Sequence, residues 1–317
     1  MQTLRLATFN CENLFARFKF NENIDPQKAV TDGWLTNSTF FEINDETSKS
    51  LTGQAIKATQ ADVIAVQEVE SLAALKRFRT RYLGGTQRFK HAILLDGNDP
   101  RLIDVGLFSK YPIQRIDTHI DEWDNQLHSH MFSRDCLECD IVLPEDKTLR
   151  LFVNHFKSML DMDDPCNGRK NTREKRLHQS QRVKDIVSQQ FPDGTGNFAI
   201  IGDFNDYLET DQQAETGIGD LVNWNFVENV VSRKIEDERW THYFGGNSQC
   251  GILPSYRQLD YILLSKTIAE NSDEEPDIIR NGLAKAADRY TGPRFDGVGQ
   301  ETPAASDHCP VVIKINL

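Results

Sequence analysis

The stretch Ile-Ile-Gly-Asp-Phe-Asn-Asp at residues 200–206 decides how the chain is organised. Residues 197–201 form a short apolar run after a turn rich in proline and glycine, which predicts a buried strand ending at Gly202. Asp203 and Asn205 follow, and at a strand end two residues spaced in this way can point in the same direction. The carboxylate can then accept a proton while the amide donates to an anionic oxygen, which suits attack by water on phosphorus. Asp and Asn are also ordinary turn formers, so this stretch alone leaves both interpretations open.

The same pattern, an apolar strand that ends in polar or ionisable residues, recurs along the chain. It is present at residues 8–12 (TFNCE), 66–68 (VQE), 153–155 (VNH), 259–261 (LDY) and 306–308 (SDH). Taken in this order with residues 200–206, these blocks resemble the endonuclease/exonuclease/phosphatase superfamily. That superfamily includes DNase I-like nucleases, abasic-site endonucleases, inositol polyphosphate 5-phosphatases and neutral sphingomyelinases. The resemblance runs from residue 4 to about residue 313, and the overall spacing is most similar to that of bacterial nuclease-like members.

The composition is that of an ordinary soluble globular protein. The chain has 317 residues, 38% hydrophobic and 26% charged, and no window approaches the uncharged apolar run of a membrane helix. Because residues 1–3 lead straight into a strand, no signal peptide fits, and we expect a cytoplasmic protein unless the sequence is that of a trimmed mature form. The net charge of -12 argues against tight, sequence-independent coating of DNA. It does not exclude a nuclease, since a metal site gathers carboxylates and a local basic rim can hold phosphates.

The cysteines do not form a recognisable zinc motif. Cys136 and Cys139 have the spacing of half a zinc site, but no second half of matching spacing follows. In a strand, moreover, positions three apart face opposite sides. We therefore expect the cysteines to be reduced thiols of a cytosolic protein. They are Cys11, Cys136, Cys139, Cys166, Cys250 and Cys309.

The order of apolar stretches predicts an α/β (α+β) fold. Helices are expected at residues 51–60, 71–81 and 174–190, and strands at 4–10, 63–66, 91–95, 105–109, 113–118, 136–143, 149–156, 197–201, 222–227, 259–264 and within 304–314. This alternation fits two packed mixed β-sheets flanked by helices. The resemblance implies the DNase I-like four-layer sandwich, in which the strand-end blocks would converge on one edge. With no repeat, linker or composition break, residues 1–317 are expected to form a single domain.

Residues 15–50 are polar and irregular. We expect them to form an insertion above the active face, packed down by Phe40 and Phe41.

Four metal ligands are implied by the resemblance. Glu68 matches the family's metal-binding glutamate and Asn10 the asparagine beside it, while Asp307 matches an aspartate near the metal. Glu12 matches an acidic residue that some members use. Oxygen ligands of this kind suit Mg²⁺ or Mn²⁺, with water in the remaining positions. Without the resemblance, a glutamate at a strand end is more often a surface charge.

Catalytic residues are implied in the same way. Asp203 matches the catalytic aspartate that takes the proton of the attacking water, and Asn205 would stabilise charge on phosphorus. His155 matches a histidine that contacts the scissile phosphate, and His308 one that bonds the phosphate or the water. Asp260 matches the carboxylate that orients His308. In isolation, His155 would be a satisfied core histidine and Asp260 a strand-edge aspartate.

Substrate-binding residues are expected around this centre. Arg134 stands where relatives often have a basic residue near the substrate, and Lys157 could reinforce the charge of His155. Asp104 precedes a strand at a place where some relatives carry an acidic partner for that histidine.

Residues 169–176 are the densest positive cluster in this acidic chain. They either grip phosphates that flank the cleaved one or form a solvated helix start. The cations concerned are Arg169, Lys170, Arg173, Lys175 and Arg176.

Together these features predict a metal-dependent phosphodiesterase, with a nuclease as the leading interpretation and a nucleic acid or another phosphodiester as substrate. The alternative is a phosphatase or a phospholipase C-like hydrolase of inositol phosphates or lipid headgroups, because fold and site alone do not separate these activities. A non-catalytic binding module is a third interpretation, against which the intact Glu68, Asp203 and Asn205 argue. We expect a monomer without a membrane span.

Overall fold

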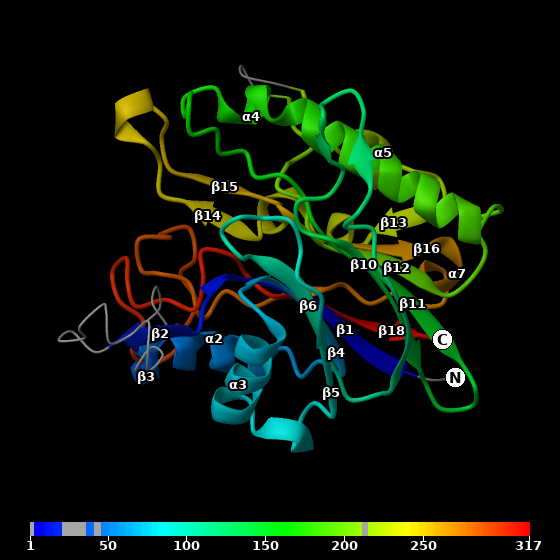
Figure 1. Ribbon diagram of the computed structural model, residues 1–317, viewed down its shortest axis with the longest axis horizontal. Coiled ribbons are helices and arrows are strands. Elements are labelled where there is room, and N and C mark those ends of the chain that lie inside the picture. Colours follow the sequence, from blue (N-terminus) through cyan, green and yellow to red (C-terminus); the bar gives the residue numbers. More distant parts are fainter. Residues whose placement is uncertain (1–2, 21–35, 41–45, 211–214) are drawn as a thin grey trace, which may run out of the picture.

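The computed structural model describes residues 3–20, 36–40, 46–210 and 215–317. Two sheets, each of six strands within these residues, form its centre (Figure 1). The first sheet has the order β17 (Asp277–Ile278), β18 (Val311–Asn316), β1 (Thr3–Leu14), β4 (Val63–Val69), β6 (Asp104–Ser109) and β5 (His91–Leu94). The second has the order β13 (Val227–Asn229), β16 (Asp260–Ser265), β12 (Phe198–Asp203), β11 (Thr148–His155), β10 (Cys136–Val142) and β7 (Ile113–Asp117).

Both sheets are mixed, as the sequence predicts. In the first, β1 and β4 are parallel, with Asn10 opposite Gln67. In the second, β11 and β12 are parallel, with His155 opposite Asp203. The other strand pairs of the two sheets are antiparallel. The carboxyl ends of the two parallel pairs meet where Asn10 of β1 donates a hydrogen bond to Asp203 of β12.

Helices cover the outer faces of the two sheets, which confirms the expected four-layer sandwich. One apolar core lies between the sheets and contains Leu6 and Ile201, one from each sheet. A second core joins the first sheet to α2 (Glu46–Ala58) and α3 (Leu72–Tyr82), and a third joins the second sheet to α5 (Arg173–Gln190). Figure 1 shows α5 on one side of the sheets and α2 and α3 on the other.

Short α-helices and two-stranded ribbons lie outside the two sheets. They are α4 (Gly168–Asn171), α6 (Gly219–Val222), α7 (Lys266–Ala269) and the two-stranded ribbons β2 (Arg17–Phe20) with β3 (Thr36–Phe40), β8 (Trp123–Asp124) with β9 (Ser129–His130), and β14 (His242–Phe244) with β15 (Ser255–Arg257). The strand expected at residues 222–227 is wrong, because residues 219–222 form α6 and the strand begins only at Val227. Among the described helices, none combines the length and apolar character needed to cross a bilayer.

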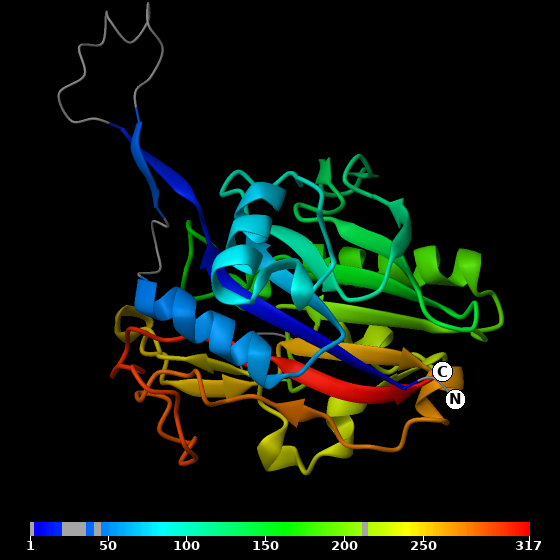
Figure 2. The ribbon, with the colours of Figure 1, turned by 90° about the horizontal axis from the view of Figure 1, so that it is seen from below.

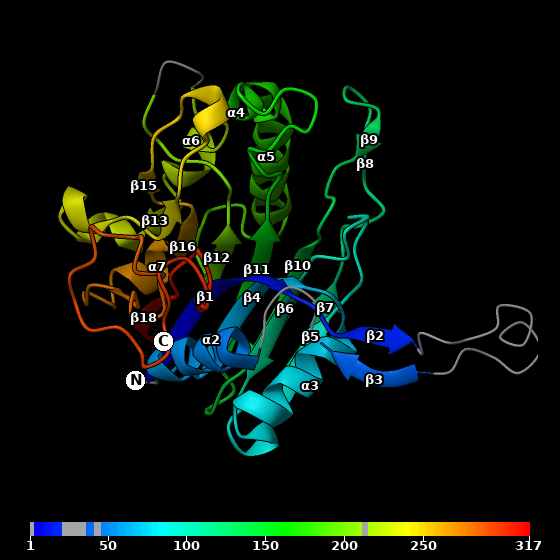
Figure 3. The ribbon, with the colours of Figure 1, turned by 90° about the vertical axis from the view of Figure 1, so that its left-hand side faces the viewer.

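The expected insertion is described only in part. The β2–β3 ribbon extends away from the two sheets in Figures 2 and 3. Residues 46–50 belong to α2, so the expected helix begins earlier than residue 51. Phe41, which we expected to pack the insertion down, lies outside the described residues.

Candidate active site

The polar ends of strands from both sheets meet at one edge of the sandwich. Within the second sheet, β12 places Asp203 between His155 of β11 and Asp260 of β16. Asn10 comes from β1 in the other sheet, and its Nδ2 lies 3.0 Å from Oδ2 of Asp203. This hydrogen bond joins the two sheets at the point where the strand-end blocks were expected to converge.

Asp203 is buried and is held by several donors. The backbone N–H of Asn205 donates to Oδ1 at 2.8 Å, and the side-chain amide of Asn205 donates to Oδ2 at 3.0 Å. Asn205 adopts the left-handed conformation with φ of 52°, which asparagine tolerates better than most residues. Burial raises the pKa of Asp203, and the opposing charge of His308 only partly offsets this shift.

Gly202 permits the close strand pairing behind this carboxylate. Its φ is 139°, and a Cβ at this position would lie 1.9 Å from the carbonyl oxygen of Asn154 on β11. The glycine of the Gly-Asp-Phe-Asn block is thus required by the approach of two backbones.

His308 is oriented by Asp260 and Thr241. Nδ1 of His308 lies 2.8 Å from Oδ2 of Asp260, and the Thr241 hydroxyl donates to the same oxygen at 2.7 Å. Nε2 of the ring faces Asp203, at 3.8 Å from its Oδ2. Burial disfavours the charged ring, but the carboxylates of Asp260 and Asp203 outweigh it and raise the pKa of His308 well above its usual value. Sequence analysis did not assign a role to Thr241.

His155 is fully enclosed and lies on the opposite side of Asp203. Its Nε2 is 3.4 Å from Oδ2 of Asp203 and 3.8 Å from Oε1 of Glu68. Burial, reinforced by the charge of Arg134, holds the pKa of His155 well below its usual value. Burial thus favours the neutral ring of His155, whereas the neighbouring carboxylates favour the charged ring of His308.

The expected pairing of Asp104 with His155 is wrong. Asp104 instead accepts the backbone N–H of Gly97 at 2.9 Å. Nδ1 of His155 is buried and has no hydrogen-bond partner among the described residues.

Three carboxylates gather beside Asn10. Oε1 of Glu68 accepts from the Asn10 amide at 3.3 Å, and Oε2 of Glu12 accepts the N–H of Asp307 at 3.1 Å. Glu12 and Glu68 both have positive φ values, 48° and 61°, which are uncommon for glutamate and often mark functional sites. Burial and the charges of Asp307 and Glu68 raise the pKa of Glu12 to about 8.

This carboxylate cluster fits a divalent cation. The charges of Asp307 and Glu68 disfavour ionisation of Glu12, and a bound cation would relieve this repulsion. The side chains offer only oxygen ligands, as Mg²⁺ and Mn²⁺ prefer. Among the described residues, the groups of three potential ligands whose donor atoms all lie within 4.8 Å of one another are His242, Asp307 and His308, and Asp203, Asp260 and His308. Glu12 and Glu68 belong to neither group, so the shared metal site of the four expected ligands stays a prediction.

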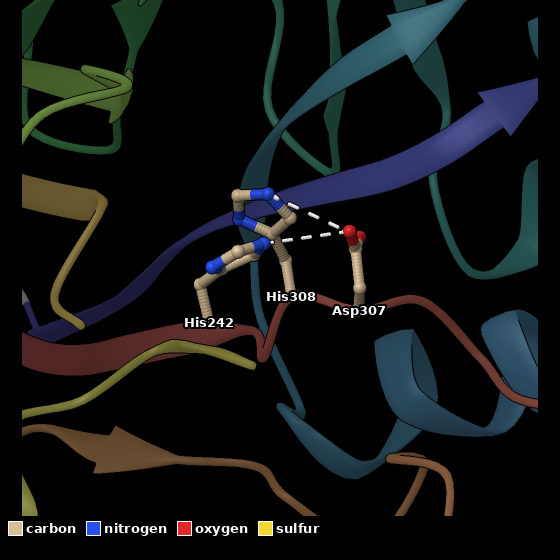
Figure 4. Close-up of side chains that lie close together, drawn as sticks. All are labelled: His242, Asp307 and His308. Carbon is tan, nitrogen blue, oxygen red and sulfur yellow. Dashed lines mark ion pairs between the residues drawn. The ribbon is translucent and has the colours of Figure 1, made fainter. Parts of the chain in front are cut away.

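His242 joins the site from β14 and was given no role by sequence analysis. Figure 4 shows His242 and His308 both directed at Asp307. Nε2 of His242 lies 3.4 Å from Oδ2 of Asp307, and the centres of the two histidine rings are 4.5 Å apart. Desolvation favours the neutral acid of Asp307, but the neighbouring histidines outweigh it and lower the pKa of Asp307. The signal for His242 in the sequence is weak, because its strand has only three residues.

Two of the five cations at residues 169–176 are internal, which corrects both interpretations for Arg169 and Arg176. Nε of Arg169 and Nε of Arg176 lie 2.9 and 3.0 Å from the two oxygens of Asp206. Both arginines and the aspartate are buried. Arg173 is more exposed, and its Nη2 lies 3.6 Å from a carboxylate oxygen of Glu215. Two of the expected phosphate-gripping charges are therefore neutralised inside the protein.

Arg134 and Lys157 lie behind the reacting centre. Arg134 is buried, donates to the carbonyl of Phe156 at 3.1 Å and has its Nε 3.0 Å from Asp99. Nζ of Lys157 donates to the carbonyl of Leu160 at 2.8 Å. Burial and the charge of Arg134 lower the pKa of Lys157 to about 8. Both cations thus contribute positive charge near the site while binding protein atoms.

A cleft of about 650 Å³ opens over the residues expected to carry the chemistry. Its floor contains Glu68, Asp203, Asn205, Asp307 and His308. One wall is the segment before and into α4, and the other is the β14–β15 ribbon with its connecting loop. The wall residues include Met159, Leu160, Pro165 and Arg169 on one side and His242, Phe244, Leu253, Ser255 and Arg257 on the other.

A disulfide links the two walls, and it corrects the expectation that all cysteines are reduced. Cys166 and Cys250 are bonded to each other across 84 residues of sequence. Cys136 and Cys139 are buried free thiols on β10 that contribute to different cores, as the prediction of opposite strand faces requires. No spacing pattern in the sequence indicates the bonded pair, because its two cysteines come from separate loops.

Comparison with known proteins agrees with this architecture. The sequence model of the Endonuclease/Exonuclease/phosphatase family matches residues 7–308. No curated protein gave a significant match to the sequence.

Similar solved structures share the fold at low sequence identity. Truncated TDP2 from Caenorhabditis elegans aligns with a TM-score of 0.58 and 13% identity over 99% of this chain and 98% of that one. D. rerio TDP2 in complex with a single-strand DNA product aligns with a TM-score of 0.58 and 16% identity over the whole of both chains. The mannosyl-6-phosphatase Bt3783 of Bacteroides thetaiotaomicron aligns with a TM-score of 0.57 and 13% identity. The alignment covers 99% of this chain and 100% of that one.

Proposed function

We propose that this chain, which belongs to the endonuclease/exonuclease/phosphatase family, is a metal-dependent phosphodiesterase that cleaves nucleic acid. The observation that carries the proposal is the environment of Asp203. Donor groups of Asn10 and Asn205 lie within 3.0 Å of its carboxylate, and ring nitrogens of His155 and His308 lie at 3.4 and 3.8 Å. A proton acceptor surrounded by donors is what in-line attack of water on a phosphodiester requires.

In this proposal the residues that would hold the cation are Glu68, Asn10, Glu12 and Asp307. When bound there, Mg²⁺ or Mn²⁺ would supply positive charge to a phosphoryl oxygen and to the leaving oxygen. Nε2 of His242 lies 3.4 Å from Oδ2 of Asp307, so His242 would contribute to positioning this ligand.

The chain's own residues then divide the chemistry. Asp203 takes the proton of the attacking water, for which its raised pKa makes it a better acceptor than an ordinary aspartate. His308, held as the imidazolium by Asp260, places a positive charge beside the pentavalent phosphorus. Neutral His155 and the Asn205 amide contribute hydrogen bonds to the phosphoryl oxygens. No covalent intermediate is needed.

Both classes of phosphoester hydrolase occur among the similar structures, so a phosphatase is the second candidate. The D. rerio TDP2 complex with single-strand DNA product supports the nuclease proposal, whereas Bt3783, a mannosyl-6-phosphatase, supports the alternative. The cleft of about 650 Å³, with a wall on each side, favours a substrate that extends on both sides of the phosphorus, as a diester does.

A substrate panel tests the proposal. It contains single- and double-stranded DNA, RNA, an abasic duplex, bis(p-nitrophenyl) phosphate and inositol phosphates, each with Mg²⁺, with Mn²⁺ and with EDTA. We expect hydrolysis of polynucleotides and of the small diester, loss of activity in EDTA and recovery with either metal. Hydrolysis of monoesters alone would select the phosphatase, and full activity of metal-stripped protein in chelator would refute the metal-dependent scheme.

The disulfide bears on where the protein works. Because such bonds persist in oxidising compartments, we propose an extracytoplasmic location in place of the cytoplasmic one expected from the sequence. The expected single domain and monomer remain predictions, which limited proteolysis and light scattering would test.

A further inference from the structure

The β14–β15 ribbon presents one chemically distinct face to the cleft. His242 is paired with Arg257 across the ribbon, and Phe244 with Ser255. All four line the cleft, as residues that alternate along two paired strands must if they share a face. The intervening Tyr243 and Tyr256 face the other way, and the Tyr256 ring packs against Trp240.

Arg257 lies close to the reacting centre. Directly opposed residues of an antiparallel pair have Cβ atoms about 5 Å apart, so Arg257 starts beside His242. His242 in turn reaches Asp307 at 3.4 Å. A group bound by Arg257 would therefore lie next to the phosphate that is cleaved.

The charge of Arg257 is available for a ligand. Its guanidinium lies 4.8 Å from the centre of the Tyr207 ring, and its one hydrogen bond, to the Tyr256 carbonyl, is long at 3.4 Å. No carboxylate within the described parts of the chain forms an ion pair with it. Arg169, the other arginine that lines the cleft, is instead bound to Asp206.

We propose that Arg257, with the Ser255 hydroxyl beside it on the same strand face, forms a subsite for a second phosphate of the substrate. This subsite rests on the proposed phosphodiesterase function and specifies its substrate as one with adjacent phosphates, as in an oligonucleotide. The planar guanidinium fork matches phosphate oxygens and gains rigidity from stacking on Tyr207. Phe244, 38% exposed on the same face, offers a ring on which a nucleobase can stack.

The position of this subsite replaces the one expected from the sequence. Residues 169–176 carry more positive charge, but the buried Asp206 neutralises Arg169 and Arg176. A single half-buried arginine without an acidic partner is the stronger anion site, because no internal ion pair has to be broken when the phosphate binds.

Dinucleotides that differ by one phosphate test the inference. The substrates are TpT and its forms with an additional 5′ or 3′ phosphate, assayed with metal-loaded wild-type protein. We expect one phosphorylated form to have a KM lower than that of TpT by about tenfold or more, as one charge-assisted hydrogen-bonded contact provides. Arg257→Gln should remove this difference while kcat changes less than twofold, and Arg257→Lys should keep part of it.

Arg115→Gln is the matched control, since Arg115 is exposed on the edge strand β7 and pairs with Asp117. It should leave all KM values unchanged. The subsite would be overturned if wild type had the same KM for TpT and for both phosphorylated forms. It would also be overturned if Arg257→Gln raised the KM of all three substrates by the same factor. Absence of hydrolysis of every dinucleotide by wild type would instead refute the proposed function.

A measurement on wild type alone guards against a misfolded variant. The KM of the preferred phosphorylated dinucleotide should rise more steeply with salt than that of TpT, because one more phosphate is neutralised by the protein. Identical salt dependence for the two substrates would count against the subsite.

Discussion

Oδ2 of Asp260 accepts two hydrogen-bond contacts, one from Nδ1 of His308 at 2.8 Å and one from the Thr241 hydroxyl at 2.7 Å. Thr241 also receives the backbone N–H groups of Leu259 and Asp260 at 3.1 and 3.0 Å. Thr241 thus holds Asp260 in place, and Asp260 in turn orients the ring of His308. The ring of His308 is left with one free nitrogen, which faces Asp203.

Replacing Asp260 should change the titration of His308. In Asp260→Asn the carboxylate that raises the pKa of His308 is lost, so the pKa falls and the imidazolium deprotonates at lower pH. We expect the alkaline limb of the kcat profile to move to lower pH, together with the NMR titration of the His308 ring. Thr241→Ser keeps the hydroxyl and should leave both curves in place. Unchanged curves in Asp260→Asn would mean that Asp260 serves the fold only.

Asp203→Asn should remove the proton acceptor and keep the shape of the site. The rate should fall by at least the roughly 10²–10⁴-fold typical of general acid–base catalysis, while substrate binding survives. The measurement is single-turnover hydrolysis at saturating metal. Glu68→Gln is the comparison, because higher Mn²⁺ should recover part of its loss. A rate for Asp203→Asn within about fivefold of wild type, well inside that range, would exclude Asp203 as the base.

The two arginines of one helix should differ sharply in their effect on stability. Arg176 is fully buried and donates to Asp206, to the Thr172 hydroxyl and to the carbonyl of Arg169. Arg176→Gln leaves Asp206 paired with Arg169 but deprives buried acceptors of a charged donor, so it should lower the free energy of unfolding by about 1–3 kcal/mol. Arg173 pairs with a mostly exposed Glu215, and Arg173→Gln should cost less than about 1 kcal/mol. Urea unfolding measures both. Similar losses in the free energy of unfolding for the two variants would show that the contact of Arg176 with Asp206 does not stabilise the fold.

Asp104 should make stability depend on pH in the acidic range. Burial raises its pKa to about 6, so the folded state holds a proton that the unfolded chain releases near pH 4. The stability that the protonated Asp104 contributes to the folded state is fully present below pH 4 and is lost as pH rises through 6. This contribution to the free energy of unfolding is at most about 3 kcal/mol. Asp104→Asn should therefore be more stable than wild type at pH 7 and closer to it at pH 4. Parallel stability curves from pH 4 to 7 would contradict this assignment.

The strands and the residues at their ends could be predicted because both depend on local sequence. An apolar run that stops at Asp203, His155 or Asp260 carries its own signal, and parallel pairing then brings such ends together. Recognition of the family, the two mixed sheets and the flanking helices followed from these runs and are confirmed. The roles of the gathered side chains stay predictions.

What could not be predicted depends on partners distant in sequence. Arg169 and Arg176 look like surface charges until Asp206 is placed between them. His242 and Arg257 lie on strands of three residues, too short for a periodic signal. The partner of Asp104 is a backbone N–H, which no pattern of side chains reveals.

The Cys166–Cys250 bond has a consequence for the entropy of substrate binding. It connects the loops that form the two walls of the cleft, so their separation is set when the protein folds and oxidises. Walls that are already ordered do not lose conformational freedom when a substrate enters, and more of the contact energy then appears as affinity. The covalent link thus makes the cleft a preorganised receptor, with the width of the opening fixed before the substrate arrives.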